Sequence, residues 1–288
     1  LNLPKGLINF VYGKGETVGK YLSAHPDIDM ISFTGSVETG SSIMQEAGKN
    51  ITKVNLELGG KAPAIVLEDA DINKAVSKIK NARVINSGQV CNCVERVYVQ
   101  NNILEEFTDK LSKVMENVSY GNPNFESNIE YGPMINERGL SKVEGLVNSA
   151  SMEGAEIITG GKSTKIENGS YYEPTLIANC TQNMKIIRKE IFGPVLPIVS
   201  FNDLDEAINY ANDCDYGLTS SIFTKNIKVA MRAANEIKFG ETMINRENME
   251  IFQAFHAGIR KSGIGGADGK HGLYEYMQTH GVYINYGD

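Results

Sequence analysis

The sequence has few of the residues from which disulfide scaffolds and structural metal sites are built. Only four cysteines occur in 288 residues, and none of them form a C-x-x-C pair. The four histidines also lack the spacing of zinc ligands. These absences argue against a disulfide-rich secreted domain and against a bound metal, and they favour a reducing compartment. We therefore expect a cytoplasmic protein without a metal site.

Long apolar runs are missing as well. The longest stretches, such as residues 64–67, are far too short to span a bilayer. No basic segment followed by an apolar one opens the chain, so no secretory signal is predicted. The net charge of −7 argues against nucleic acid or an anionic membrane as the main partner.

The length of the chain and its first residues indicate how many domains to expect and whether the chain is complete. Its 288 residues, 41% of them hydrophobic and 22% charged, suffice for one large domain or two ordinary ones. The chain starts with Leu1 instead of Met, and its first six residues read like the interior of a protein. We expect a fragment or a split subunit.

Short β-like runs alternate with helical periods along the chain, which is typical of an α/β protein. Strands are predicted over residues 7–11, 29–33, 54–58, 64–67, 96–100, 156–159, 175–177, 196–201, 221–224 and 243–245. Helices are predicted over residues 16–23, 37–48, 71–85, 103–118, 137–150, 205–211 and 229–237. The alternating tail, residues 281–285, is expected to add a strand to a sheet of a partner chain.

The loop N-S-G-Q-V-C-N-C, residues 86–93, is the first candidate for chemistry. A cysteine in a turn flanked by Gly and Ser is well placed to be an exposed thiol, and backbone N–H groups there can converge on a developing oxyanion. Taken alone, the loop favours the plainer interpretation that Cys91 and Cys93 are small buried apolar residues.

Glu57 interrupts an apolar strand, V-N-L-E-L. A carboxylate among leucines at a strand end can have a raised pKa and act as a base near neutral pH. In isolation, an alternating strand with Glu57 facing solvent is the favoured interpretation.

Two further stretches suit a dinucleotide. Residues 31–40 run strand, glycine turn, helix, which leaves free N–H groups where a phosphate can sit. Their glycines do not form a G-x-G-x-x-G fingerprint, and residues 13–19 miss it by one position. Glu190 and Phe192 can present a carboxylate to a ribose diol and a ring to the sugar or base. The alternative for this pair is a surface turn before a strand.

Four motifs in this order resemble the aldehyde dehydrogenase superfamily. They are F-T-G-S at 33–36, L-E-L-G-G-K at 56–61, G-Q-x-C at 88–91 and E-x-F-G-P at 190–194, supported by turns at 132–133, 160–162, 172–176 and 216–219. The resemblance covers the whole chain. It implies an α/β fold with a partial Rossmann-type cofactor domain and a three-layer α/β catalytic domain.

The resemblance also implies a division of the chain. Residues 1–58 would be the C-terminal part of the cofactor-binding domain, 59–270 the catalytic domain, and 271–288 a return and oligomerisation tail in a homo-oligomer, either a dimer or a tetramer. The family's early nucleotide-binding strands, its oxyanion Asn and its adenosine-ribose Lys would precede Leu1. We therefore expect this chain alone to be inactive and unstable.

The resemblance assigns roles to individual residues. Cys91 would attack the aldehyde as a thiolate, hydride would leave for the nicotinamide, and Glu57 would activate water to hydrolyse the thioester. The implied cofactor-binding residues are Thr34, Gly35, Ser36, Gly40, Leu58, Glu190 and Phe192. Ser36 would meet the pyrophosphate, and Glu190 the nicotinamide ribose. NAD is the expected cofactor, and NADP stays open because the deciding ribose contacts would lie upstream.

The substrate prediction depends on the polar loop 245–258. Glu250 and His256, with Asn92 beside the nucleophile, can hydrogen-bond a hydroxyl next to the aldehyde carbonyl, which discriminates against substrates lacking it. For an arbitrary loop, solvated side chains would be preferred. However, residues 255–272 and 86–93 look like those of bacterial lactaldehyde dehydrogenases, which also oxidise glycolaldehyde. The expected substrate is thus a small 2-hydroxyaldehyde.

Other interpretations remain. A semialdehyde dehydrogenase would need a cation for the distal carboxylate, and Arg246 and Arg260 are the nearby options. A thiol hydrolase or acyltransferase would share Cys91 but has no use for residues 33–36. The alternative in which the chain is not an enzyme is a truncated, non-catalytic remnant. The dehydrogenase assignment requires that Cys91 and Glu57 face one cleft, bordered on its cofactor side by the Ser36 turn and Glu190.

Overall fold

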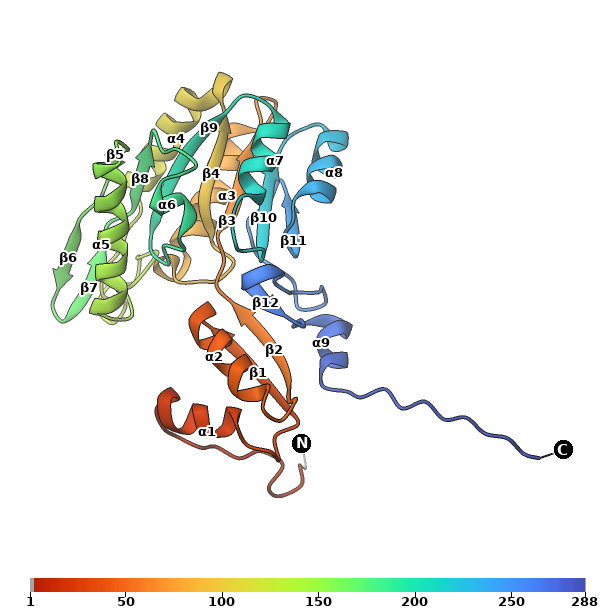
Figure 1. The fold of residues 1–288 in the computed structure, drawn as a ribbon. Helices are drawn as coiled ribbons and strands as arrows, with labels where there is room; N and C mark the ends of the chain where they lie inside the picture. Colours follow the sequence, from red (N-terminus) through yellow and green to blue (C-terminus); the bar gives the residue numbers. More distant parts are fainter. Residues whose placement is uncertain (1–2, 288) are drawn as a thin grey trace.

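The computed structural model describes residues 3–287, and they form an α/β architecture (Figure 1). A seven-stranded sheet has the order β11-β10-β3-β4-β9-β8-β5, a three-stranded sheet the order β1-β2-β12, and β6 pairs with β7 in a hairpin. In Figure 1 the smaller sheet lies below the larger one, and the chain passes between them where β2 leads into β3.

The seven-stranded sheet is parallel except at one edge. Its strands are β3 (Ala62–Val66), β4 (Val94–Gln100), β5 (Glu156–Thr159), β8 (Thr175–Ala178), β9 (Val195–Phe201), β10 (Thr219–Phe223) and β11 (Glu241–Ile244). Only β5 pairs antiparallel, with β8. Parallel strands are covered on both faces because the crossovers between them place helices there.

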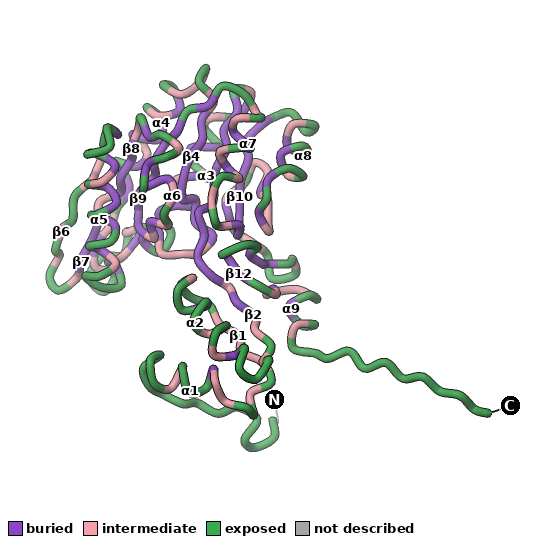
Figure 2. The backbone as a smooth tube through the Cα atoms, viewed as in Figure 1, coloured by how far each residue is buried: buried purple, intermediate pink, exposed green. Residues whose placement is uncertain are grey.

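Helices cover both faces of this sheet. Strand β3 shows the two cores, because Ala64 and Val66 pack into one and Ile65 into the other. The helices of the first core are α3 (Ile72–Val84) and α4 (Leu104–Glu116). Those of the second are α5 (Glu137–Met152), α6 (Lys185–Arg188), α7 (Leu204–Asn212) and α8 (Ile227–Glu236). The predicted three-layer α/β arrangement is confirmed, and Figure 2 shows the buried strands at its centre.

The helix predicted over residues 71–85 is confirmed as α3, which begins after the capping residue Asp71. Asp71 has extended backbone angles, and its carboxylate accepts a hydrogen bond from the Lys74 N–H at 3.1 Å. A side chain that accepts from a first-turn N–H replaces a missing intrahelical bond. The apolar spacing that follows buries Ala75, Val76 and Ile79 against the sheet.

The smaller sheet brings distant segments together. Strands β1 (Met30–Gly35) and β2 (Lys53–Leu58) are parallel and linked by α2 (Val37–Ala47), and β12 (Gly263–Ile264) adds antiparallel to β2. A π-helical turn, Gly15–Gly19, and α1 (Lys20–Ser23) precede them. Residues near 263 therefore return to the sheet formed by the first 58 residues, and the three-part division of the chain stays a prediction.

The strand predicted over residues 7–11 is wrong. Leu7, Ile8, Phe10 and Val11 are exposed and carry no ladder hydrogen bonds within residues 3–287 (Figure 2). A strand needs a neighbour for its backbone groups, and apolar β-formers alone do not supply one.

Several short elements were not predicted. They are β6 (Ser163–Ile166), β7 (Gly169–Tyr172), α6, β12 and α9 (Gly269–Glu275). After α9 the chain runs extended and exposed away from the body (Figures 1 and 2). Its pairing with a partner chain stays a prediction. Among the described helices, none combines the length and the apolar composition needed to cross a membrane.

Candidate active site

A cleft of about 470 Å³ lies between the two sheets. It is lined by Thr34, Gly35, Ser36, Glu57, Leu58, Gly59, Gln89, Val90, Cys91, Lys142, Glu190 and Phe192. The structure thus brings Cys91 and Glu57 into one cleft with the Ser36 turn and Glu190, as the sequence predicts. Their chemical roles stay predictions.

The loop before Cys91 has an unusual backbone. Asn86, Ser87 and Gly88 have φ angles of 49°, 59° and 73°, a region that costs energy for residues with a side chain. The Ser87 hydroxyl donates to the Gly132 carbonyl at 2.8 Å, and the Arg83 guanidinium donates to the Gly88 carbonyl at 2.7 Å. These contacts hold the loop so that Cys91 borders the cleft.

The two loop cysteines differ. Cys91 is partly exposed, whereas Cys93 is buried, and burial raises the pKa of the Cys93 thiol to about 11. A thiol with a raised pKa is a poor nucleophile near neutral pH because little thiolate forms. The interpretation as a small buried apolar residue therefore holds for Cys93 and is wrong for Cys91.

Glu57 does not face solvent. Its side chain is 12% exposed, and both carboxylate oxygens are buried without a hydrogen-bond partner in the described part of the chain. Burial raises the pKa of Glu57 to about 7, although the His256 ring partly opposes this rise. A carboxyl group that titrates near 7 can accept a proton at physiological pH.

His256 lies between carboxylates. Its Nδ1 is 2.8 Å from Glu241 Oε2, and its Nε2 is 3.8 Å from Glu57 Oε2. Hydrogen bonding with Cys91 and with Glu241 raises the pKa of the His256 ring well above its usual value. The prediction of a solvated loop residue is wrong here, because the main chain of His256 is also fixed by two hydrogen bonds to Ala267.

Asn92 and Glu250 meet next to Cys91. The Asn92 amide donates to the Glu250 carboxylate, and the Asn92 carbonyl accepts from the Thr219 hydroxyl at 3.1 Å. Both side chains line a second cavity of about 290 Å³ together with Val90, which also lines the first cleft. The loop that carries Cys91 thus separates a cavity bordered by Glu250 from the cleft bordered by Ser36 and Glu190.

The side of the cleft where the sequence predicts the cofactor combines a helix start and a carboxylate. Ser36 caps α2 by accepting from the Thr39 N–H at 3.2 Å, so the positive end of this helix borders the cleft. Glu190 accepts from the Gly60 N–H at 2.9 Å and lies 3.8 Å from the Lys142 ammonium. Burial raises the pKa of Glu190. A helix start for phosphate and a carboxylate for a ribose diol fit a dinucleotide.

Gly40 is placed differently from the prediction. It does not line the cleft, and a Cβ built on it would lie 2.7 Å from a Leu58 methyl group. Gly40 therefore serves the close packing of α2 on β2, since a side chain there would displace that of Leu58. Leu58 itself does line the cleft.

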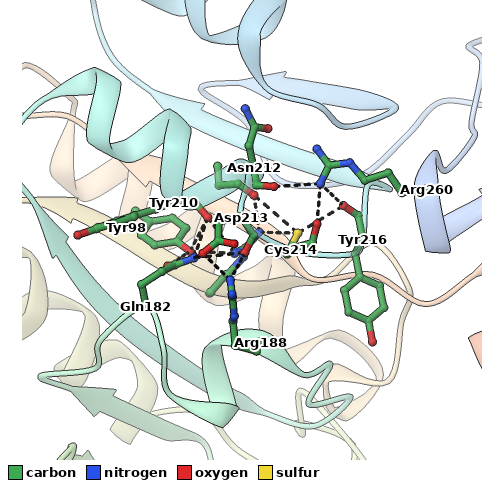
Figure 3. Close-up of polar contacts among 11 residues, drawn as sticks. Tyr98, Gln182, Arg188, Tyr210, Asn212, Asp213, Cys214, Tyr216 and Arg260 are labelled. Carbon is green, nitrogen blue, oxygen red and sulfur yellow. Dashed lines mark hydrogen bonds and ion pairs between the residues drawn. The ribbon is translucent and has the colours of Figure 1, made fainter.

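The two arginines considered for a distal carboxylate are engaged elsewhere. Figure 3 shows the Arg260 guanidinium directed at backbone carbonyls, and its Nη1 donates to those of Asn212, Cys214 and Tyr216 at 3.1, 2.7 and 3.2 Å. Arg246 donates to the Met249 carbonyl at 2.6 Å. Neither lines the two cavities. Neither arginine therefore offers a cation to a distal carboxylate in these cavities.

Sequence reasoning missed three contributors, namely Glu241, Lys142 and Gly59. Glu241 opens β11, and nothing in the sequence links it to His256 before the sheet is formed. Gly59 lies against Glu190, since a Cβ there would be 2.5 Å from Glu190 Oε1 and would displace that carboxylate. Over residues 3–287, no group of three or more His, Cys, Asp or Glu side chains is arranged to hold a metal ion.

Comparison with known proteins decides the family. A model of the aldehyde dehydrogenase family matches residues 1–282. The chain belongs to this family. The predicted resemblance, which rested on four ordered motifs, is therefore confirmed, and so is the fold class.

Individual members of the aldehyde dehydrogenase family are also similar. The chain is 57% identical to lactaldehyde dehydrogenase of Escherichia coli strain K12 over 99% of its length, and 39% identical to D-glyceraldehyde dehydrogenase (NADP(+)) of Picrophilus torridus over 99%. It spans 59% and 58% of the lengths of these two relatives.

Solved structures agree with this placement. The crystal structure of Escherichia coli lactaldehyde dehydrogenase matches with a TM-score of 0.94 and 58% identity, covering 95% of this chain and 57% of that one. Betaine aldehyde dehydrogenase from Staphylococcus aureus in complex with NAD+ matches with a TM-score of 0.92 and 41% identity, covering 96% and 55%.

Proposed function

We propose that the protein carrying this chain oxidises a small 2-hydroxyaldehyde, such as lactaldehyde or glycolaldehyde, to the carboxylic acid with NAD as hydride acceptor. The observation that carries the proposal is the shared cleft of Cys91 and Glu57, with His256 between two carboxylates beside them. Identity of 57% to lactaldehyde dehydrogenase of Escherichia coli supports the choice of substrate.

The reaction begins and ends on Cys91. Its thiolate attacks the aldehyde carbon, a C–S bond forms, and the carbonyl oxygen becomes an oxyanion that a backbone N–H of the loop can stabilise. Collapse of this oxyanion expels a hydride, for which NAD, when bound, would supply the acceptor. The resulting thioester on Cys91 is opened by water, which loses its proton to Glu57, and the acid leaves as the thiolate is restored.

The residues proposed to bind the cofactor would hold the dinucleotide and align it with Cys91. Ser36, at the start of α2, would meet the pyrophosphate, and Glu190 would bind the nicotinamide ribose with Phe192 packed beside it. Thr34 and Gly35, which line the same cleft, would lie near the nicotinamide. NADP remains the alternative cofactor, and a D-glyceraldehyde dehydrogenase (NADP(+)) is among the relatives.

Substrate choice is assigned to the polar groups around Cys91. The ring of His256 and the Asn92–Glu250 pair offer donors and acceptors to a hydroxyl next to the carbonyl. A substrate that lacks the hydroxyl forgoes these contacts, and the loss lowers its kcat/KM.

Cys91 is tested first. In the protein carrying this chain, we expect NAD-dependent oxidation of lactaldehyde, and loss of at least about a thousandfold in kcat on Cys91→Ser. Cys93→Ser, its neighbour in the same loop, is the matched control and should retain turnover. Retained turnover in Cys91→Ser, with Cys93→Ser inactive, would move the nucleophile and contradict the proposal.

His256 is tested by substrate comparison. We expect His256→Ala to lower kcat/KM for lactaldehyde by roughly tenfold to a hundredfold more than for propanal, because only lactaldehyde has the hydroxyl. Steady-state kinetics with both aldehydes measure the ratio. Equal losses for the two substrates would remove His256 from hydroxyl recognition and leave the oxidation itself untouched.

Two properties of the whole protein complete the proposal. We propose a cytoplasmic location from the cysteine content, and a homo-oligomer from the exposed tail. Both follow the predictions made from the sequence.

A further inference from the structure

A fully buried group of three charges lies under the cleft. Lys61, Arg83 and Glu95, here called the Glu95 cluster, have side chains at most 2% exposed. Glu95 Oε2 is 2.8 Å from Lys61 Nζ, and Glu95 Oε1 is 2.8 Å from Arg83 Nη1. None of the three lines the cleft, so the proposed reaction does not use them directly.

The Glu95 carboxylate also binds the loop that holds the ribose residue. Its Oε2 accepts from the Ile191 N–H at 2.7 Å, and its Oε1 accepts from the Phe192 N–H at 3.0 Å. These are the two backbone groups directly after Glu190. Phe192 has a φ angle of 59°, which is unfavourable for a residue with a side chain. Two charge-assisted bonds therefore fix a strained backbone next to Glu190.

Arg83 binds the other loop. Its Nη2 donates to the Gly88 carbonyl at 2.7 Å, and its Nη1 donates to the Val94 carbonyl at 2.6 Å. These carbonyls lie on either side of Cys91. The two loops also touch, because a Cβ on Gly88 would lie 2.3 Å from the Gly193 carbonyl oxygen. The nucleophile loop and the ribose loop thus share one ionic anchor.

The stability of the fold alone does not explain why three charges are buried here. Burying three charges costs solvation, and an apolar set of similar volume is often at least as stable. The buried Arg83 Nε has no hydrogen-bond partner among the described residues. Although burial acts to raise the pKa of Glu95, Lys61 and Arg83 hold it at about 2, so the carboxylate stays charged at all working pH values. The charges supply directional bonds to both loops, which apolar residues cannot do.

We propose that Glu95 and Arg83 are positioning residues that set the spacing between the Cys91 loop and the Glu190–Phe192 loop, and thereby align the nucleophile with the ribose end of the dinucleotide. This inference rests on the proposed function. It makes the affinity for the cofactor depend on residues that never touch it.

Variants that keep the charge test this role. Arg83→Lys retains the cation, but one ammonium cannot reach Glu95, Gly88 and Val94 together. Glu95→Asp retains the anion but withdraws it from the loop N–H groups. Arg96→Lys is the matched control, since Arg96 is equally buried on β4 and binds neither loop. Its Nη atoms contact Tyr98, Cys214 and the 210–211 carbonyls, and its Nε donates to the Lys61 carbonyl at 2.9 Å, a main-chain group of the cluster that the shorter ammonium would release without changing the Glu95 carboxylate.

The measurements are the Kd for NADH, from nicotinamide fluorescence, together with KM for NAD, kcat, Tm and the alkylation rate of Cys91. For Arg83→Lys and Glu95→Asp we expect Kd and KM to rise roughly tenfold, as loss of hydrogen bonds to a charged group implies. Arg96→Lys also disturbs a buried charge, so it should lower Tm, but it should leave the Kd for NADH unchanged.

The outcomes distinguish a failure of the positioning role from a failure of the proposed function. If both cluster variants lower Tm like Arg96→Lys yet bind NADH like the unaltered protein, the cluster is only structural and the inference is wrong. If the unaltered protein neither binds NADH nor oxidises an aldehyde while Cys91 is alkylated normally, the proposed function fails, and the inference fails with it.

Discussion

Glu57 shows how a single residue acquires its chemistry from its surroundings. It follows Leu56 and precedes Leu58 on a strand, and burial raises the pKa of its carboxyl group to about 7. The leucine neighbours allow a raised pKa, but in isolation the strand pattern favoured a solvent-facing Glu57, and that interpretation is wrong because the side chain is buried. The His256 contact, which moderates the pKa, was not predicted, because His256 lies in a distant loop that returns to this strand only in the folded chain.

The pH dependence of turnover follows from this pKa. A base must be ionised, so the hydrolysis of the thioester should rise with pH up to about 7 and level off above it. Glu57→Gln should abolish the rising limb and lower the hydrolysis rate by roughly a hundredfold or more, measured as kcat or as thioester accumulation in single turnovers. An unchanged pH profile in Glu57→Gln would assign the base to another residue.

The same pKa makes the stability of the fold decrease with rising pH, whereas activity is expected to increase. The folded-state pKa lies above the ordinary value of 4.5, so the folded protein binds more protons than the unfolded chain between about pH 4.5 and 7. Ionisation of Glu57 therefore destabilises the fold as pH rises through this window. A base that is costly to the fold is consistent with a functional site.

At the scale of elements, long periodic segments were predictable and short pairings were not. Helices such as α3 and α5 follow from apolar spacing and a capping residue, since their hydrogen bonds are local. The two-residue strand β12 forms only because Leu56 and Glu57 are brought beside it by the fold. The failed strand at 7–11 is the converse case, with suitable residues and no neighbour.

The candidate site follows the same rule. Cys91, Glu57, Ser36 and Glu190 were predicted because each stands in a recognisable motif, whereas Glu241 stands in none. Its contact with His256 depends on where β11 ends up relative to the loop after it. Sequence motifs thus mark the residues that we propose to react, whereas the side chains that contact them emerge only from tertiary packing.

The connection from β2 to β3 allows a prediction about an element. A Cβ on Gly60 would lie 2.7 Å from the Cys91 carbonyl oxygen, which is backbone and cannot swing away. We expect Gly60→Ala to displace the nucleophile loop and lower kcat/KM by at least roughly tenfold. The displaced loop should also alter the alkylation rate of Cys91.

Gly145→Ala is the matched control for this substitution. Gly145 lies within α5, and a Cβ there meets nothing within 4 Å. Ala is the better helix former, so the change should stabilise the protein by up to about 1 kcal/mol without affecting kinetics. Wild-type activity in Gly60→Ala would show that the β2–β3 turn has more freedom than its contacts indicate.

At the scale of the whole molecule, the C-terminal tail exposes apolar side chains that a partner chain would cover. Val282, Tyr283, Ile284 and Tyr286 are exposed on an extended chain that contacts no sheet within the described residues. The side chains of residues 282 and 284 would share one face of a strand, and those of 283 the other. An apolar, alternating, unpaired strand is a suitable edge for pairing with another chain.

The tail therefore predicts the effect of charge on assembly. We expect Val282→Asp combined with Ile284→Asp to shift the protein to a smaller species in light scattering after size exclusion, because two carboxylates would have to be buried on the paired face. Ile227→Asp, at an equally exposed position at the start of α8, is the matched control and should leave the assembly intact. If the doubly charged tail leaves the molar mass unchanged while the control behaves as expected, the tail does not hold the subunits together, and the interface must be sought on another exposed apolar segment such as residues 7–12.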